Sequence, residues 1–360
     1  MTNLRLGLVG YGLGGRLFHA PFIAAAEGVE LVGAVTRSPA RRAQLAADFP
    51  GVPAADSLDQ LIDTGVQAVV ITTPPATRRE LVLAAIARGV AVVADKPFAP
   101  DAAGGQDLVD AADAAGVPLA VFHNRRWDTD MRTLRALLRT GELGRVRRFE
   151  SLFDIDDPST IDPGPEGGLL RDLGAHVVDQ ALWQFGPVQD VYAALDWVER
   201  PEGPTDAGFT MTLRHESGVV STLTASKANH AEGRELRVYA ERGSYHSAMS
   251  DVQFAAVLDG RRPVMEGDAW GFESEERWGT VRTAAGERRV PSERGAYQDY
   301  YTQFARAVRG EGSLPVTGAE AVATLKVLDA ARLSDRERRI VTLRWDQPAG
   351  CLAETGQSSG

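Results

Sequence analysis

The sequence predicts an α/β protein in which an amino-terminal doubly wound parallel sheet is followed by an α/β domain with an open, mainly antiparallel sheet. Short apolar strands and helices alternate through about residue 122, as in a parallel sheet with crossover helices. Beyond that point, long strand-like runs follow one another with Gly, Pro and Asn turns, which indicates antiparallel pairing. The 360 residues, 44% of them hydrophobic, suit two globular domains.

These patterns divide the chain into residues 1–123, residues 124–346 and a polar tail at 347–360. In the first domain we expect strands at 4–9, 30–35, 66–71, 91–96 and 118–122, and helices at 16–23, after Ser38, at 78–88 and at 104–115. In the second domain we expect helices at 129–139, 167–183, 295–308 and 318–333, and strands at 146–154, 191–198, 209–215, 219–225, 236–240 and 340–343.

Composition excludes several classes of function. The net charge is −10 with both signs interspersed, which disfavours a nucleic-acid surface. Cys351 is the only cysteine, so neither an intrachain disulfide nor a cysteine-based metal site can form, and a reducing cytoplasm fits. Because no leader and no apolar run of about 18 residues is found, we expect neither export nor membrane insertion.

A glycine-rich segment directly follows the first strand. Gly10-Tyr11-Gly12-Leu13-Gly14-Gly15 contains Gly-x-Gly-x-x-Gly between a strand and a helix, the setting in which this motif binds a dinucleotide. Gly10 permits the tight turn, Gly12 the approach of a diphosphate, and Gly15 the packing of helix on strand. We expect Phe18 and His19, on the helix, to have packing roles.

The end of the second strand suggests which cofactor binds. An acidic side chain there usually holds the ribose 2′-hydroxyl of NAD, but this chain has Thr36-Arg37-Ser38. Arg37 and the two hydroxyls suit the 2′-phosphate of NADP. An arginine stacked on the adenine would give the same pattern, so NADP is preferred and NAD remains possible.

One lysine stands at the end of a buried strand. The apolar run from Ala91 ends in Asp95-Lys96-Pro97, and ligands bind at the carboxyl edge of open α/β sheets. The proline restrains the geometry of Lys96. Lys96 is therefore a candidate for chemistry, and a solvated loop lysine is the alternative.

The second domain contributes a carboxylate and a histidine four residues apart. Asp172 and His176 would share one face of a helix and could interact directly. A histidine oriented by a carboxylate is a common general acid/base. The alternative is a polar pair within a helix.

Together, Gly10-x-Gly12-x-x-Gly15, Thr73-Pro74, Asp95-Lys96-Pro97 and Asp172-x-x-x-His176 resemble, in order and spacing, the Gfo/Idh/MocA oxidoreductases. Phe122 to Asp128 is most similar to the branch of NADP-dependent scyllo-inositol dehydrogenases. The resemblance implies a Rossmann domain, an open carboxyl-terminal sheet that forms a homodimer or homotetramer, and hydride transfer between NAD(P) and a polyol or sugar. The chain departs from the family at Asp95, where glutamate is more common, and at Arg78, where histidine often stands.

The resemblance also implies roles for individual residues. Lys96, Asp172 and His176 would be catalytic, and no metal is expected. Cofactor contacts would come from Gly10, Tyr11, Gly12, Leu13, Gly15, Thr36, Arg37, Ser38, Thr73, Pro74, Asp95, Lys96, Pro97, Asn124 and Arg125. Substrate contacts would come from Lys96, Trp127, Asp154, Asp172, His176 and Tyr301. As in similar family members, the Lys96-Pro97 peptide is expected to be cis.

Two alternatives remain for the function. The chain could be a non-catalytic NADP-binding regulatory protein on the same fold, because fold does not determine function. It could also reduce another carbonyl, such as a ketosugar or a dihydrodiol-type substrate.

Overall fold

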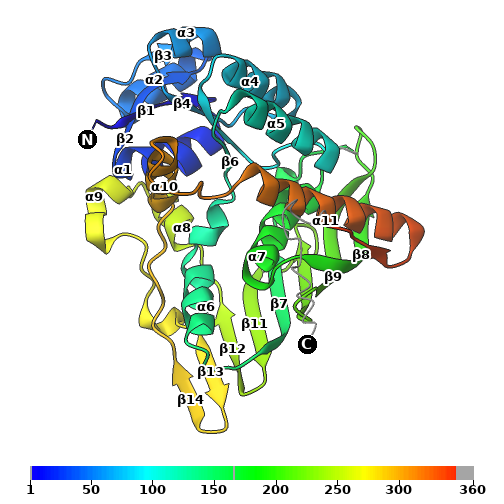
Figure 1. Cartoon of the computed structure of the whole chain (residues 1–360). Helices are drawn as coiled ribbons and strands as arrows, with labels where there is room; N and C mark the ends of the chain where they lie inside the picture. Colours follow the sequence, from blue (N-terminus) through cyan, green and yellow to red (C-terminus); the bar gives the residue numbers. More distant parts are fainter. Residues whose placement is uncertain (1, 165–166, 346–360) are drawn as a thin grey trace, which may run out of the picture.

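The computed structural model describes residues 2–164 and 167–345, and its amino-terminal part is built on a six-stranded parallel sheet (Figure 1). The strand order is β3-β2-β1-β4-β5-β6. The strands are β1 (Leu4–Val9), β2 (Val29–Val35), β3 (Ala54–Ala55), β4 (Ala68–Ile71), β5 (Ala91–Ala94) and β6 (Leu119–Val121). The helices between them are α1 (Ala20–Ala25), α2 (Pro39–Asp48), α3 (Leu58–Asp63), α4 (Pro75–Ala87) and α5 (Ala102–Ala115). The doubly wound sheet is confirmed.

The second sheet has nine strands, in the order β14-β13-β12-β11-β7-β10-β9-β8-β15. They are β7 (Val146–Asp154), β8 (Val188–Val198), β9 (Thr205–His215), β10 (Val220–Ser226), β11 (Gly233–Ala240), β12 (Gly243–Ala248), β13 (Thr280–Thr283), β14 (Gly286–Arg289) and β15 (Val341–Thr342). Only the central pair of β7 and β10 is parallel among these strands. The mainly antiparallel sheet, and with it the predicted fold class, is confirmed.

The helices of this part are α6 (Thr129–Arg139), α7 (Ala175–Phe185), α8 (Val252–Leu258), α9 (Pro263–Glu266), α10 (Gln298–Val308) and α11 (Gly318–Glu337). Short 3₁₀ turns occur at η2 (Asn124–Trp127), η3 (Pro158–Thr160), η5 (Gly267–Ala269) and η6 (Glu275–Arg277). Two predicted helices begin with π-helical turns, η1 (Gly14–His19) and η4 (Leu170–Gly174). The prediction omitted the short elements β3, β12 to β14, α3, α8 and α9. The polar tail and Cys351 lie outside the described residues.

The two sheets are joined by the segment that leads into α11. Thr317 pairs with Ala120 in the edge strand β6, and the Val121 amide donates to the Val316 carbonyl at 3.2 Å. The α11 helix then runs across both parts in Figure 1, packing against α5 and β8. It begins with a capping box in which Thr317 and Glu320 satisfy each other's backbone amides. No helix among the described residues is long and apolar enough to cross a membrane.

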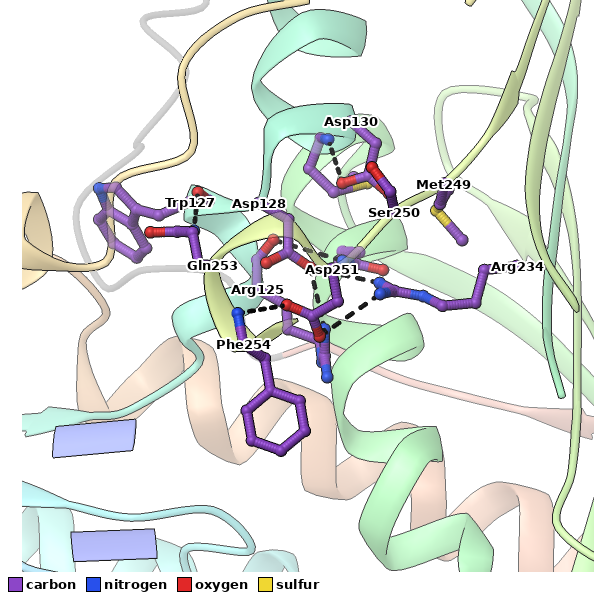
Figure 2. A network of polar contacts seen from close by, with 12 residues as sticks. Arg125, Trp127, Asp128, Asp130, Arg234, Met249, Ser250, Asp251, Gln253 and Phe254 are labelled. Atoms are coloured by element: carbon purple, nitrogen blue, oxygen red, sulfur yellow. Dashed lines mark hydrogen bonds and ion pairs between the residues drawn. The ribbon is translucent and has the colours of Figure 1, made fainter. Parts of the chain in front are cut away.

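A buried ionic network holds η2 in the second domain (Figure 2). Arg125 binds Asp128 at 3.1 Å and Asp251 at 2.9 Å, and Arg234 of β11 approaches both carboxylates at 3.4 Å. Both guanidinium groups lie over the ring of Phe153. The two positive charges therefore have two negative partners, which buried charges require.

Asp130 lies next to this network and has no ion pair of its own within residues 2–164 and 167–345. It is 3% exposed; one oxygen accepts from the Met131 amide, and the other has no hydrogen-bond partner among the described residues. Burial, together with the negative charge of Asp128, raises the pKa of Asp130 to about 7. The folded chain therefore favours the protonated carboxyl.

This raised pKa predicts a pH dependence of stability. An unfolded aspartate ionises near pH ~3.9, so the stabilising effect of the protonated Asp130 is complete below that pH and is lost as pH rises towards about 7. Asp130→Asn should remain neutral, so its free energy of unfolding relative to wild type should rise from pH 4 to pH 7, on the order of a few kcal/mol. Urea unfolding would measure this difference. The exposed Asp259→Asn serves as the control, and parallel curves for Asp130→Asn and wild type would contradict the prediction.

Candidate active site

The glycine-rich loop leaves β1 in a conformation that only glycine adopts easily. Gly10 has φ of +110°, and a Cβ atom on Gly15 would lie 2.0 Å from the Gly10 carbonyl oxygen. A Cβ on Gly12 would instead meet only the Arg41 guanidinium, 3.8 Å away, because Gly12 faces open space. A loop this tight, with an accessible backbone at Gly12, fits the diphosphate of a dinucleotide.

A cleft of about 540 Å³ extends from this loop to the π-helical turn η4. Nine of the predicted site residues line it, namely Gly10, Gly12, Leu13, Thr73, Pro74, Asp95, Lys96, Pro97 and Asp172. It therefore joins the carboxyl edge of the parallel sheet to the second domain. The wall also includes nine residues that the sequence did not suggest as site residues, namely Gly14, Arg41, Thr72, Pro75, Arg78, Asp162, Gly167, Gly168 and Arg171.

The Lys96-Pro97 peptide is cis, as predicted. The backbone beside it is held by Arg78, whose guanidinium donates to the Pro97 carbonyl and, at 2.7 Å, to the Thr73 carbonyl. Arg78 is 4% exposed, and burial lowers its pKa against the opposing effect of Asp95. Arg78, which stands where the family often has histidine, is thus a buried cation that hydrogen-bonds to the backbone of two cleft-lining loops.

Asp95 receives hydrogen bonds from both sides. Its carboxylate accepts from the Thr72 hydroxyl at 2.7 Å and from the Lys96 amide at 2.8 Å, and His19 Nε2 lies 3.3 Å away. Burial opposes ionisation, yet His19, Arg78 and Thr72 hold the pKa of Asp95 well below its usual range. His19 itself is buried and shares a 2.6 Å hydrogen bond with Tyr301, so it has a structural role in the packed interior.

The three residues that follow β2 lie in different environments. Thr36 is buried, Ser38 accepts from the Arg41 amide as the cap of α2, and Arg37 is exposed. Arg37 does not line the cleft, whereas Arg41, one turn into α2, does. The cleft wall therefore has one arginine from the first turn of α2, and Arg37 stands exposed at the preceding end of β2.

Asp172 is bound by two lysines. Lys96 Nζ lies 2.5 Å from Asp172 Oδ1, and Lys227 Nζ lies 2.8 Å from Oδ2. Lys96 also donates to the Asp172 carbonyl at 3.2 Å. Although burial alone would raise it, these two ammonium groups hold the pKa of Asp172 well below the ordinary value.

The expected contact between Asp172 and His176 is replaced by these lysine contacts. Both carboxylate oxygens are taken by ammonium groups, and the turn at Asp172 is π-helical, with α-helix beginning only at Ala175. Unlike Lys96 and Asp172, His176 does not line the cleft wall. It is 6% exposed, and its Nδ1 has no hydrogen-bond partner among the described residues. Burial, then the charges of Lys96 and Arg125, lower its pKa well below the ordinary value, so the imidazole is neutral at neutral pH.

Several predicted contact residues do not line the cleft. Tyr11 donates to Asp48 at 2.9 Å, and the Arg125 side chain is used in the ionic network. The other predicted cofactor contacts outside the cleft wall are Gly15, Thr36, Arg37, Ser38 and Asn124.

The three additional substrate candidates also lie elsewhere. Tyr301 is fully buried behind His19, which corrects the expectation of a direct substrate contact. Trp127 lines a separate groove together with Arg132 and packs edge-on against Tyr300. Asp154 accepts from Asn229 at 3.0 Å at the end of β7. Because these side chains come from separate elements, η2, β7 and α10, sequence order could not place them.

Lys227 is a further residue that sequence reasoning missed, although the sequence carried a signal. The chain has 39 lysines and arginines, and only Lys96, Lys227 and Lys326 are lysines. Lys227 directly follows β10, and Lys96 stands two residues after the end of β5. No group of three His, Cys, Asp or Glu residues that could hold a metal occurs among the residues that the structure describes.

Two family models match the chain. Residues 4–123 match the oxidoreductase family with an NAD-binding Rossmann fold, and residues 131–246 match the GFO/IDH/MocA C-terminal domain. Together they cover most of both parts of the structure described above.

Individual relatives agree with these matches. The scyllo-inositol 2-dehydrogenase (NADP(+)) IolW of Bacillus subtilis is 30% identical, covering 95% of this chain and 97% of that protein. A D-apiose dehydrogenase of Paraburkholderia graminis is 31% identical over 81% of this chain and 76% of its own length. The solved structure of the oxidoreductase yvaA from Bacillus subtilis superposes with a TM-score of 0.87 at 29% identity, covering 95% and 99% of the two chains. This chain belongs to the Gfo/Idh/MocA family of NAD(P)-binding oxidoreductases.

Proposed function

We propose that this protein transfers a hydride between NADP and a secondary alcohol or ketone of a cyclic polyol or sugar, of the inositol or aldose type. The observation that carries the proposal is the meeting of Lys96, from the edge of the first sheet, with Asp172 of the second domain in the glycine-lined cleft. The similarity to a scyllo-inositol dehydrogenase supports the substrate class.

The proposal gives each group a distinct task. Lys96 donates a hydrogen bond to the reacting carbinol oxygen and stabilises the alkoxide that develops there. His176, neutral because of its lowered pKa, accepts the hydroxyl proton during oxidation and returns it during reduction. Asp172 orients Lys96. The nicotinamide supplies only the hydride chemistry, and the glycine loop with the Thr73-Pro74 segment would hold the cofactor.

The preference for NADP rests on the cations near α2. Arg37, the Ser38 hydroxyl and Arg41 would contact the 2′-phosphate, and a carboxylate that would favour NAD is missing from the end of β2. A guanidinium forms paired, charge-assisted hydrogen bonds with phosphate. NAD would lack that contact.

The proposal also extends to assembly and location. We expect a homodimer or homotetramer formed through the nine-stranded sheet, whose strand β8 exposes Tyr192 and Trp197. The setting would be cytoplasmic, with small-molecule substrates and no nucleic-acid or membrane partner.

A screen of inositols and aldoses with NAD and NADP in parallel tests the function. Wild type should oxidise at least one cyclic polyol or sugar, with a higher kcat/KM for NADP than for NAD. Arg37→Ala should raise the KM for NADP roughly tenfold and leave the KM for NAD within about twofold, because only NADP loses a phosphate contact. Arg88→Ala, a surface change in the same domain, is the control.

Three outcomes of the screen would change the proposal. Equal or better efficiency with NAD would reassign Arg37 to adenine stacking. Cofactor binding without turnover of any substrate would favour the regulatory alternative. Turnover restricted to ketosugars or dihydrodiols would support the proposed oxidoreductase activity but replace the proposed substrate class.

Replacing the two proposed catalytic groups, His176 and Lys96, should affect the kinetics differently. His176→Asn should lower kcat about 100-fold or more with cofactor affinity nearly intact, because a proton acceptor is lost. Lys96→Ala should lower kcat and also raise the substrate KM. Steady-state kinetics and NADPH fluorescence titration would separate these effects. Near-normal turnover by His176→Asn would exclude His176 as the acid/base.

A further inference from the structure

Lysine is rare in this chain, and two of its lysines meet at one carboxylate. Of 39 basic residues, 39 − 3 = 36 are arginines, and the lysines are Lys96, Lys227 and Lys326. Lys326 lies on α11 with its ammonium over the ring of Trp345. The other two bind opposite oxygens of Asp172. A chain that otherwise uses arginine thus has two ammonium groups at its proposed active site.

Lys227 is rigidly placed for this contact. It follows β10, which lies between β7 and β9 in the centre of the second sheet. Its amide donates to the Ala207 carbonyl at 3.0 Å, and its side chain is 6% exposed. Besides Asp172 Oδ2 at 2.8 Å, the ammonium reaches the Thr160 carbonyl at 3.4 Å. A buried ammonium requires such a partner, because an unpaired charge is costly to bury.

The cluster of Lys96, Lys227 and Asp172 carries one positive charge in excess. Two ammonium groups share one carboxylate, while Arg125 and Arg234 are balanced by Asp128 and Asp251. His176, on α7, is neutral at neutral pH because it is buried and because Lys96, Arg125, His123 and Arg234 act on it. The other charged groups that line the cleft with this cluster are Arg41, Arg78, Asp95, Asp162 and Arg171.

We propose that Lys227 is a positioning residue for the proposed hydride transfer. It holds Asp172 Oδ2 so that Oδ1 faces Lys96, and its charge adds to that of Lys96 where an alkoxide develops. The inference rests on the proposed function and extends it to a residue outside the catalytic set. Lys227 acts through Asp172 and Lys96, not by contact with the substrate.

The role predicts different effects for two substitutions. Lys227→Met removes the positive charge, so Asp172 can rotate. The kcat for scyllo-inositol oxidation with NADP should then fall between about 10-fold and 100-fold. The acidic limb of the pH profile of kcat should move to higher pH, because a positive charge near the proposed base is lost. Lys227→Arg keeps the charge but changes the geometry, so kcat should fall while that limb stays in place. Affinity for NADPH should change less than twofold in both variants.

The scarcity of lysine provides a readout that does not need turnover. Labelling with ¹³Cε-lysine yields three side-chain signals in the full-length protein, which Lys326→Met and Lys227→Met assign. In Lys227→Met the Lys96 signal should shift and broaden, because its carboxylate partner is no longer fixed. Lys326→Met, the matched control, should leave the Lys96 signal, kcat and the pH profile unchanged.

The two readouts separate the possible failures. An unchanged Lys96 signal in folded Lys227→Met would overturn the inference, as would an unshifted pH profile in an active enzyme. The wild type could lack dehydrogenase activity while its Lys96 signal still depends on Lys227. That result would overturn the proposed function, but it would support the positioning of Lys96 by Lys227 through Asp172. Thermal unfolding would verify that Lys227→Met is folded, and Lys227→Arg would supply the kinetic test if it were not.

Discussion

The proposed active site depends on one carboxylate that binds cations from both sheets. Lys96 follows strand β5 at the carboxyl ends of the parallel strands, and Lys227 follows β10 in the centre of the second sheet. Asp172, on the π-helical turn, binds both. In a half-buried cleft such charge-assisted contacts are short and directional. The position of Lys96 is therefore set by both domains, so their relative placement and the chemistry of the cleft are coupled.

Most of the charges around this cluster are paired. Arg125 and Arg234 are neutralised by Asp128 and Asp251, and Asp95 is held by His19 and Arg78. Lys96, whose charge also acts on His176, shares its carboxylate with a second cation, Lys227. A positive field that keeps the imidazole neutral also favours an alkoxide, and these are the two conditions required by proton removal from an alcohol.

Local patterns predicted the parts of the molecule that local geometry determines. The glycine loop, the buried strand ending at Lys96 and the run of helix and strand through residue 122 depend on nearby residues, and the structure has them. The lysine cluster depends on strand order, since β10 pairs in parallel with β7 far from it in sequence. The expected contact between Asp172 and His176 assumed an α-helix, but a π-helical turn begins there. Trp127 and Tyr301 could be placed only by tertiary packing.

The choice of lysine at both positions has a geometric reason that the chain itself illustrates. Arg126 binds Asp179 through two parallel contacts of 2.9 and 2.6 Å, and Arg16 binds Asp48 in the same way at 2.6 and 3.1 Å. A guanidinium fork thus occupies both oxygens of a carboxylate, whereas an ammonium acts as a point charge on one. Each ammonium takes a single oxygen of Asp172, which leaves the other oxygen for the second lysine. An arginine that bound Asp172 in this bidentate way would occupy the oxygen that the other lysine uses.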